Sequence, residues 1–214
     1  MNELRYTLLA DGPSDRALMP ILTWLLRQHL PRCAIQPQWA DLWRFPGRPK
    51  ELNRKIIMTI EFYQCDLLFV HRDAETISLK DRLIEIRNAI EDACESQRLH
   101  RSIGVVPVRM TEAWLLFDIN AIREAAGNPN GTVRLNLPKL KRLEDTPNCK
   151  TILHNLILEA TELGTHRKNR FKVKQAVQRI PEYIQDFSPL RNLSAFIALE
   201  EEMKRMITSK GWSS

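Results

Sequence analysis

The sequence predicts an α/β protein whose N-terminal part contains a parallel sheet. Four short strand-like segments alternate with helical patterns along the first half of the 214-residue chain. These segments are rich in apolar residues, which is expected of strands that are covered on both faces. Strands that alternate with helices form parallel sheets with right-handed crossovers. We therefore expect a Rossmann-like α/β domain at about 1–118 and a mostly helical extension at 119–214.

The first four elements are predicted from apolar runs and their spacing. Residues 5–10 (RYTLLA) form a strand-like run, and the turn residues DGPSD then lead into a helical pattern at about 16–30. The segment CAIQPQWAD, at 33–41, alternates weakly and predicts a second strand. Apolar residues on one face indicate a helix at about 50–63.

The next elements repeat this order. The apolar run at 67–71 predicts a third strand, a charged amphipathic pattern at about 78–98 predicts a helix, and IGVVPVR at 103–109 predicts a fourth strand. Helical patterns dominate from Glu112 to the end, with expected breaks at GNPNG, at Pro181 and at Pro189.

Composition indicates a globular protein without a membrane segment. Hydrophobic residues make up 43% of the chain, and no stretch approaches 18 consecutive apolar residues. The N-terminus, MNELRYTLLADG, lacks the pattern of a signal peptide. The four cysteines are widely spaced and include no C-x-x-C pair, so we expect reduced thiols and a cytoplasmic location.

The charge distribution permits nucleic-acid binding. The formal net charge is +6, and basic residues are dense at 44–54, 134–142 and 166–174. The simplest explanation for any one of these basic runs is that it forms a solvent-exposed face. The last run could instead contact DNA phosphates near the acidic site described below, and its candidate residues are Arg167, Lys168, Arg170 and Lys172.

Acidic residues follow three of the predicted strands. Asp11 comes after the first strand, Asp73 and Glu75 come after the third, and Glu112 comes after the fourth, with Asp15 close to Asp11. Parallel strands end at one edge of a sheet, and ligands bind outside that edge. Clustered carboxylates need a neutralising cation, and hard oxygen ligands suit Mg²⁺ or Mn²⁺. Such an ion can polarise a phosphoryl oxygen and activate water.

Each of these acids also has a local explanation. Asp11 and Asp15 could form turns or cap the following helix, and Glu112 could begin a helix near its positive end. Asp73 and Glu75 could pair with Arg72. Their shared position at one sheet edge favours the metal-site interpretation.

Several neighbouring residues are expected to be structural. Asp118 should cap a helix that begins at Ile119, and His71 is more often a structural histidine than a ligand. Among the aromatic residues, we expect a buried position for Trp39, Trp43 and Trp114 and an exposed position for Trp212.

Two motifs resemble the topoisomerase–primase (Toprim) domain. They are LLADGPSDRALMPIL and DLLFVHRDAE, each with an acidic residue after a predicted strand. The chain is also similar to Toprim-like nucleases that accompany ABC or SMC-type ATPases in phage defence, such as the overcoming-lysogenization-defect nucleases. The segment VPVRMTEAWLLFD has a counterpart in uncharacterised bacterial Toprim-like proteins. The resemblance covers about 1–120.

The resemblance implies a metal-dependent nuclease. It places Asp11 at the first acidic position, Asp73 and Glu75 at the D-x-D pair, and Glu112 at a position of the narrower family. Asp11 replaces the usual Glu and Glu75 the usual Asp, so the charge is kept and the reach changes by one methylene. The implied activity is Mg²⁺- or Mn²⁺-dependent hydrolysis of DNA.

The resemblance further implies an ATPase partner, and a homo-oligomer is a possible assembly. Two alternatives stay open at this point. One is a non-catalytic Toprim-like module that senses a metal or a partner. The other is a metal-dependent enzyme that acts on RNA or on a small phosphorylated molecule.

Overall fold

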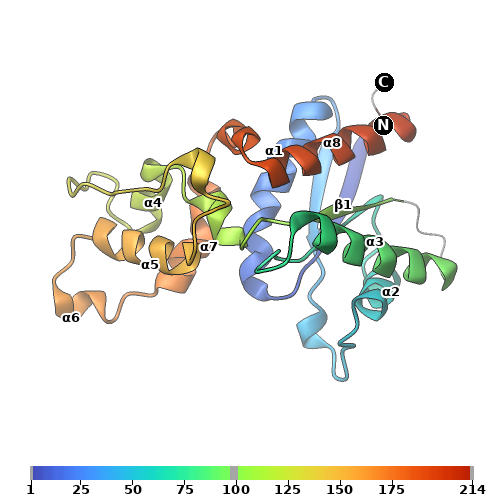
Figure 1. The fold of residues 1–214 in the computed structure, drawn as a ribbon, viewed down its shortest axis with the longest axis horizontal. Coiled ribbons are helices and arrows are strands. Elements are labelled where there is room, and N and C mark those ends of the chain that lie inside the picture. The colour runs from blue at the N-terminus through green and yellow to red at the C-terminus, as the bar shows by residue number, and fades with distance from the viewer. Residues whose placement is uncertain (1, 97–100, 213–214) are drawn as a thin grey trace.

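A four-stranded sheet forms the centre of the molecule. The computed structural model describes residues 2–96 and 101–212. All strands are parallel, in the order β2-β1-β3-β4, with bounds β1 Glu3–Leu9, β2 Ala34–Trp39, β3 Leu67–His71 and β4 Ser102–Val105. The predicted α/β class, the parallel sheet and the helical C-terminal part are thus confirmed (Figure 1).

Helices cover both faces of the sheet. Helix α1 (Leu18–His29) and helix α8 (Ser194–Ser209) pack on one face. Helix α2 (Leu52–Phe62) and helix α3 (Leu79–Ser96) pack on the other. Because side chains alternate between the two faces of a strand, the all-apolar run of β3 supplies both cores.

Strand β3 shows this alternation residue by residue. Leu67 and Phe69 belong to the core beneath α1, and the ring of Phe69 lies 5.3 Å from that of Tyr6 in an edge-to-face contact. Leu68 and Val70 belong to the core beneath α2 and α3. All four are fully buried, so β3 is the most enclosed strand and carries its last residue, His71, to the sheet edge.

The order of the strands creates a switch point between β1 and β3. The chain leaves β1 toward β2 on one side, and it returns through α2 to β3 on the other side. In doubly wound sheets, ligands bind at the carboxyl ends of the strands where the connections diverge in this way. The residues that follow β1 and β3 therefore occupy the expected ligand-binding position.

The remaining helices form a second lobe beside the sheet (Figure 1). They are α4 (Ile119–Ala125), α5 (Cys149–Ala160), α6 (Thr165–Lys168) and α7 (Val173–Tyr183). The Asp118 side chain accepts a 2.9 Å hydrogen bond from the Ala121 N–H, so the predicted cap of α4 is confirmed. The chain then returns to the sheet through α8, so the proposed boundary at residue 118 stays a prediction.

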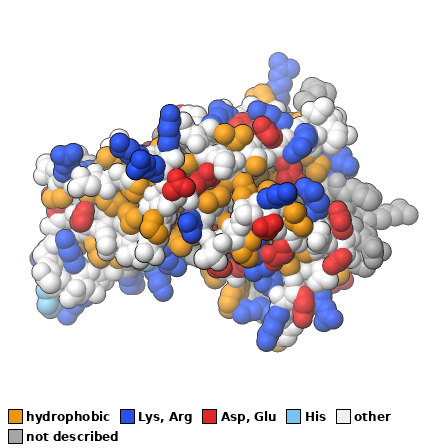
Figure 2. Space-filling model, viewed as in Figure 1, with side chains coloured by type: hydrophobic (Ala, Val, Ile, Leu, Met, Phe, Trp, Pro, Cys, Tyr) orange, Lys and Arg blue, Asp and Glu red, His pale blue; other side chains and the backbone are white. Residues whose placement is uncertain are grey.

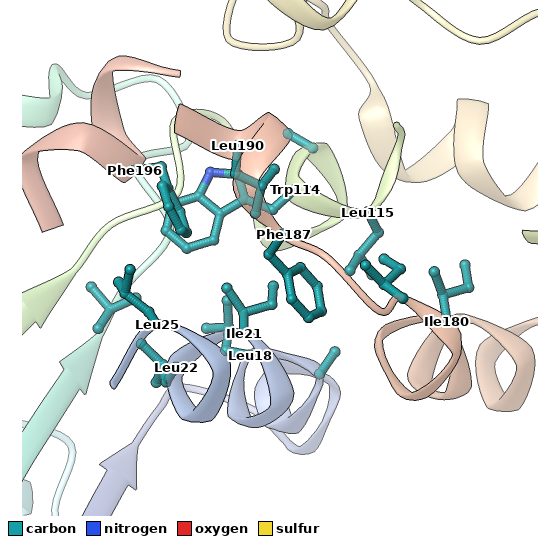
Figure 3. Close-up of a cluster of buried hydrophobic side chains, with 14 of the residues drawn as sticks. Leu18, Ile21, Leu22, Leu25, Trp114, Leu115, Ile180, Phe187, Leu190 and Phe196 are labelled. Atoms are coloured by element: carbon teal, nitrogen blue, oxygen red, sulfur yellow. The ribbon is translucent and has the colours of Figure 1, made fainter. Parts of the chain in front are cut away.

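A buried aromatic cluster joins the two parts of the molecule (Figure 3). Trp114 is fully buried, and its ring lies 5.4 Å from that of Phe196 in α8 in an edge-to-face contact. Phe187 packs against Trp24 of α1 and against Phe117. Trp114 lies in a short 3₁₀ helix, Thr111–Leu115, which directly follows the sheet. The core therefore anchors the segment that carries Glu112.

Three local expectations are wrong. Trp43 is 50% exposed instead of buried, and Trp212 is only 6% exposed instead of free in solvent. Trp212 is covered because the chain folds back after α8, where the Arg101 guanidinium lies 5.7 Å from its ring centre. Pro181 does not break its helix, because it lies in the last turn of α7.

Two further expectations concern the thiols and membranes. Cys33, Cys65 and Cys149 form no disulfide, and the side chain of Cys94 lies outside the described residues. In the part of the chain that the structure describes, no helix combines the length and the apolar character needed to cross a bilayer.

Candidate functional site

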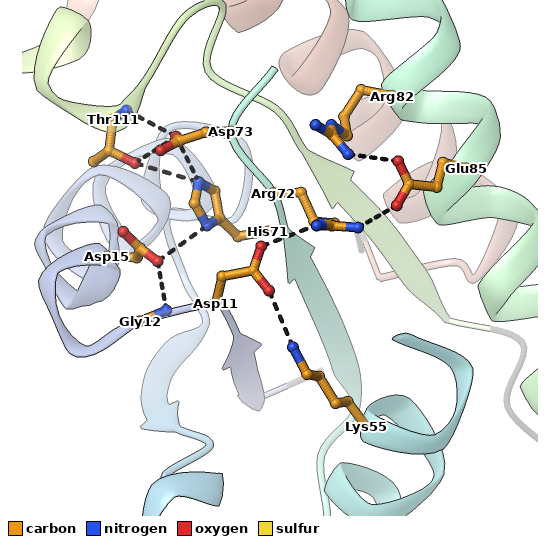
Figure 4. A network of polar contacts seen from close by, with 10 residues as sticks. All are labelled: Asp11, Gly12, Asp15, Lys55, His71, Arg72, Asp73, Arg82, Glu85 and Thr111. Atoms are coloured by element: carbon orange, nitrogen blue, oxygen red, sulfur yellow. Dashed lines mark hydrogen bonds and ion pairs between the residues drawn. The ribbon is translucent and has the colours of Figure 1, made fainter. Parts of the chain in front are cut away.

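A buried histidine lies between two carboxylates at the carboxyl edge of the sheet (Figure 4). The Nε2 atom of His71 is 3.2 Å from Oδ1 of Asp73, and its Nδ1 atom is 3.6 Å from Oδ2 of Asp15. Thr111 completes the group, since its hydroxyl lies 3.2 Å from both His71 Nε2 and Asp73 Oδ1. We call Asp15, His71, Asp73 and Thr111 the His71 cluster.

Three chain segments assemble this cluster. Asp15 comes from the 3₁₀ helix Pro13–Ala17 that follows β1, His71 ends β3, and Thr111 follows β4. β3 ends at His71, so Asp73 lies in the loop beyond it. The loop is held in place by backbone hydrogen bonds from Ala74 to Pro107 and from Glu75 to Arg109.

The cluster favours a positively charged His71. Burial alone would lower the pKa of the imidazole, but Asp15 and Asp73 outweigh burial and raise its pKa from 6.5 to about 9. A fully enclosed imidazolium is thus balanced by two acidic neighbours.

Asp15 is held as a carboxylate by the same contacts. Burial opposes its ionisation, but His71 and the N–H of Gly12, which donates to Oδ2 at 2.9 Å, outweigh burial and lower its pKa. The prediction that Asp15 caps the long helix after DGPSD is wrong, because α1 begins after Ala17 without a side-chain cap. Asp15 instead lies within the preceding 3₁₀ helix, where it accepts the N–H of the cap residue Gly12 and also faces the buried histidine. These two roles are compatible because they use one side chain in one conformation.

Asp73 is fixed through one of its two oxygens. Oδ1 accepts hydrogen bonds from the backbone N–H of Thr111, at 2.9 Å, and from the Thr111 hydroxyl, besides its contact with His71. Oδ2 has no hydrogen-bond or ion-pair partner among the described residues, and the side chain is 28% exposed. Asp73 thus has one carboxylate oxygen at the sheet edge without a partner in the part of the chain that the structure describes.

Glu112 is buried next to the His71 cluster. Burial raises the pKa of its carboxyl, and the charges of Asp73 and Asp15 raise it further, whereas Lys150 acts in the opposite direction. The Lys150 Nζ atom lies 3.8 Å from Oε1 of Glu112. The acids that follow β3 and β4 therefore lie close enough to affect each other's ionisation, and the sequence predicts this proximity.

Asp11 belongs to a separate group of charges (Figure 4). Its Oδ1 lies 3.1 Å from Lys55 Nζ, and its Oδ2 lies 3.1 Å from Arg72 Nε. Arg72 also pairs with Glu85, which in turn accepts a 2.6 Å hydrogen bond from Arg82. Asp11 lies at the predicted sheet edge, but two cations already compensate its charge.

Glu75 lies outside both groups. Its side chain is exposed, and its backbone has a φ of 53°, in the left-handed region that non-glycine residues seldom adopt. Because the strand ends at His71, the two-residue alternation of a strand does not apply to Asp73 and Glu75. The predicted roles of Asp11 and Glu75 as metal ligands stay predictions.

The predicted DNA-contacting cations lie in a different region. α6 is at the far end of the helical lobe from the sheet (Figure 1). The residues Arg167, Lys168, Arg170 and Lys172 form no ion pair with any described residue. Their charges are therefore available to an anionic partner, and their contact with DNA stays a prediction.

The described residues form no closed protein cage for a metal ion. Within residues 2–96 and 101–212, no three His, Cys, Asp or Glu side chains come close enough together to hold a metal ion. Mg²⁺ commonly keeps several waters and takes one or two carboxylates. Asp73, whose Oδ2 has no partner among the described residues, and the neighbouring Glu112 would supply that number of hard oxygen donors, and a metal ion at this edge stays a prediction.

Comparisons with known proteins do not place this chain in a family. No protein-family model matches the sequence, and neither the curated proteins nor the solved structures include a match. The function must therefore be inferred from the residues of the site.

Some members of the site are not apparent from the sequence. Thr111 is the residue before a predicted acid, and no local pattern marks it as a partner of Asp73. Lys55 is an ordinary helix residue until α2 places it 3.1 Å from Asp11. The sequence gives only a weak indication that His71 belongs to the site, since it ends an apolar run at a sheet edge. Its two carboxylate partners cannot be identified without the tertiary fold.

The His71 cluster predicts a loss of stability at alkaline pH. The pKa of His71 is 6.5 when unshifted and about 9 in the folded chain, so folding favours its protonated form. This contribution is fully present below pH 6.5 and is lost as the pH rises toward about 9. With EDTA present, we expect the free energy of unfolding to fall by roughly 2–3 kcal/mol across this window.

Urea unfolding of the wild type and of His71→Gln at several pH values measures this effect. The variant lacks the titrating group, so its stability should change less across the same window. An imidazole NMR titration of His71 with a midpoint near 6.5 would contradict the prediction.

Proposed function

We propose that the protein is a Mg²⁺- or Mn²⁺-dependent nuclease that hydrolyses phosphodiester bonds in DNA. The observation that carries this proposal is the convergence of Asp73 and Glu112, with Asp15 behind them, at the carboxyl edge of a parallel sheet. The resemblance of the DGPSD and HRDAE motifs to Toprim-like nucleases supports it. The parallel sheet is also the architecture that this resemblance implies.

In this proposal, the residues of the His71 cluster orient the acidic ligands. Asp73 and Glu112 would hold the ion, which would supply a Lewis acid for the phosphoryl oxygen and for a bound water. Thr111 and His71 hold Oδ1 of Asp73 and leave Oδ2 without a partner among the described residues. Asp15 keeps His71 charged, and this charge limits the repulsion between neighbouring carboxylates.

The cations at the edge would act on the phosphate. Arg72 and Lys55 both contact Asp11, and their side chains are only partly buried. A phosphodiester that approaches this edge would meet their positive charge beside the acidic ligands. We propose that Asp11 positions these two cations, in addition to its predicted role as a ligand.

The same resemblance supports an ABC or SMC-type ATPase as the partner and phage defence as the setting. Co-purification of the tagged chain from its native cells tests this part. Recovery of a stoichiometric ATPase would support it, and recovery of the chain alone would count against it.

A non-catalytic module is the second candidate. One observation favours it: Lys55 and Arg72 compensate the charge of Asp11, and His71 compensates Asp15 and Asp73, without any metal. Such an edge could bind a partner or a phosphorylated molecule without cleaving it.

Removal of the metal separates the two candidates. The purified full chain is incubated with supercoiled plasmid, single-stranded DNA and RNA, with Mg²⁺, with Mn²⁺ or with EDTA. We expect cleavage of DNA with either ion and none with EDTA. Cleavage of RNA alone would change the substrate class. No cleavage of any substrate, with the co-purified ATPase added, would favour the module.

A further inference from the structure

A basic pocket adjoins Asp11 at the carboxyl edge of the sheet. The connection from β2 to α2 forms a pocket of about 260 Å³. In Figure 1 this connection extends below the sheet, and in Figure 2 basic and hydrophobic side chains lie together on the same part of the molecule. The lining residues that carry the argument are Asp11, Trp43, Arg48, Lys50 and Lys55.

The charge of the pocket suits an anion. Arg48, Lys50 and Lys55 line it, and Asp11 is the one carboxylate among its lining residues. Lys55 pairs with Asp11, whereas Arg48 and Lys50 pair with no described carboxylate. Both of these cations are exposed. The pocket can therefore accept phosphate groups without first breaking an internal ion pair.

Exposed aromatic rings accompany these cations. Trp43 is 50% exposed, and the Arg48 guanidinium lies 3.2 Å from its ring centre. Phe62 is 54% exposed and lies 4.7 Å from the ring of Phe45. Large rings left in solvent beside unpaired cations are the combination by which proteins bind single-stranded nucleic acid, since bases stack on the rings and cations contact the backbone.

Several contacts and residue types restrict the conformation of this connection. Pro46 and Pro49 restrict its backbone, and Gly47 has a φ of 71°, which glycine adopts without strain. Leu42 is buried and anchors the start of the connection, and the Tyr63 hydroxyl donates a 3.1 Å hydrogen bond to the carbonyl of Asp41. Preordered binding loops lose little entropy when they bind.

We propose that this pocket binds a single-stranded DNA segment next to the acidic edge. Trp43 would stack on a base through the ring face opposite Arg48, and Arg48 and Lys50 would contact flanking phosphates. The inference rests on the proposed nuclease function and deepens it, because it names an unpaired strand as the form of the substrate. Stacked bases inside a duplex do not offer their faces to a ring, so a duplex would use only the cations.

Binding in EDTA tests this pocket independently of cleavage. Fluorescence anisotropy is measured with a labelled oligothymidylate and with a duplex of the same length, over a range of salt concentrations. We expect Trp43→Ala to weaken single-strand binding by about fivefold or more and to leave duplex binding nearly unchanged. The double variant Arg48→Ala/Lys50→Ala should lower the salt slope for the single strand by about 1.4, since each phosphate contact contributes about 0.7.

Matched controls lie elsewhere on the surface. Arg32→Ala removes an exposed cation at the opposite edge of the sheet, and Ile197→Ala removes an apolar side chain of α8 that is 41% exposed. Both should bind as the wild type does. The inference is overturned if Trp43→Ala binds the single strand normally, or if it weakens single-strand and duplex binding equally.

The binding experiment and the cleavage experiment can fail independently of each other. If the wild type cleaves DNA and Trp43→Ala binds normally, the pocket assignment fails and the nuclease stands. If Trp43→Ala loses binding and the wild type cleaves nothing, the pocket stands and the nuclease fails.

Discussion

Asp73→Asn should reduce metal-dependent DNA cleavage by about 100-fold or more, which is the scale expected when a metal ligand or an equivalent charge stabiliser is lost. The substitution keeps the size of the side chain and its acceptor for Thr111, but it removes the charge that Oδ2 presents at the sheet edge. Initial rates of plasmid cleavage with Mg²⁺ and with Mn²⁺ measure the effect. Metal affinity should fall in parallel.

A charge-matched control separates this effect from a general change of surface charge. Glu61→Gln removes one carboxylate from an exposed position on α2 that forms no ion pair with any described residue, and it should cleave as the wild type does. Circular dichroism checks that the Asp73 variant is folded. If it is not, Glu112→Gln provides the same test from the neighbouring segment. A folded Asp73→Asn protein with full activity would exclude Asp73 as a ligand.

Trp114→Ala should destabilise the fold by about 3–5 kcal/mol, the usual range for removing a large buried aromatic side chain. The ring is fully buried and contacts Phe196 of α8, so its loss leaves a cavity where the sheet and the C-terminal helix meet (Figure 3). Urea unfolding followed by circular dichroism measures the change. Trp114 and Glu112 share a 3₁₀ helix, so cleavage activity should fall as well.

Trp43→Ala is the matched control for stability. Half of this side chain is exposed, so its removal should change the free energy of unfolding by less than about 0.5 kcal/mol. Equal losses of stability for the two variants would contradict the burial pattern described above. The pair therefore tests whether the two tryptophans have different roles, one in the core and one on the surface.

Much of the architecture could be predicted from local patterns. Apolar runs mark β1, β3 and β4, whereas the edge strand β2 is marked only by a weak alternation. The run Leu67–His71 coincides with β3. The pattern works well because a strand covered on both faces must be apolar at every position. The cap at Asp118 was also predictable, because a carboxylate before a helix satisfies a free backbone N–H within a few residues.

The predicted acidic site was only partly recognisable. The alternation of strands and helices implied that Asp11, Asp73 and Glu112 would follow parallel strands at one edge, and each does follow such a strand. Their partners could not be predicted in this way. Asp11 contacts Lys55 and Arg72, and a pairing across 44 or 61 positions leaves no periodic signal.

The sequence by itself determined the order of strands and helices, the parallel sheet and the edge at which the acids gather. These features follow from the spacing of apolar residues, which is a property of neighbours along the chain. Only the tertiary structure decided that His71 lies between Asp15 and Asp73, that Asp11 faces two cations, and that Trp43 rather than Trp212 remains in solvent. The physical reason is that charge pairing and burial depend on distances in space, and segments far apart in the chain set those distances when they pack.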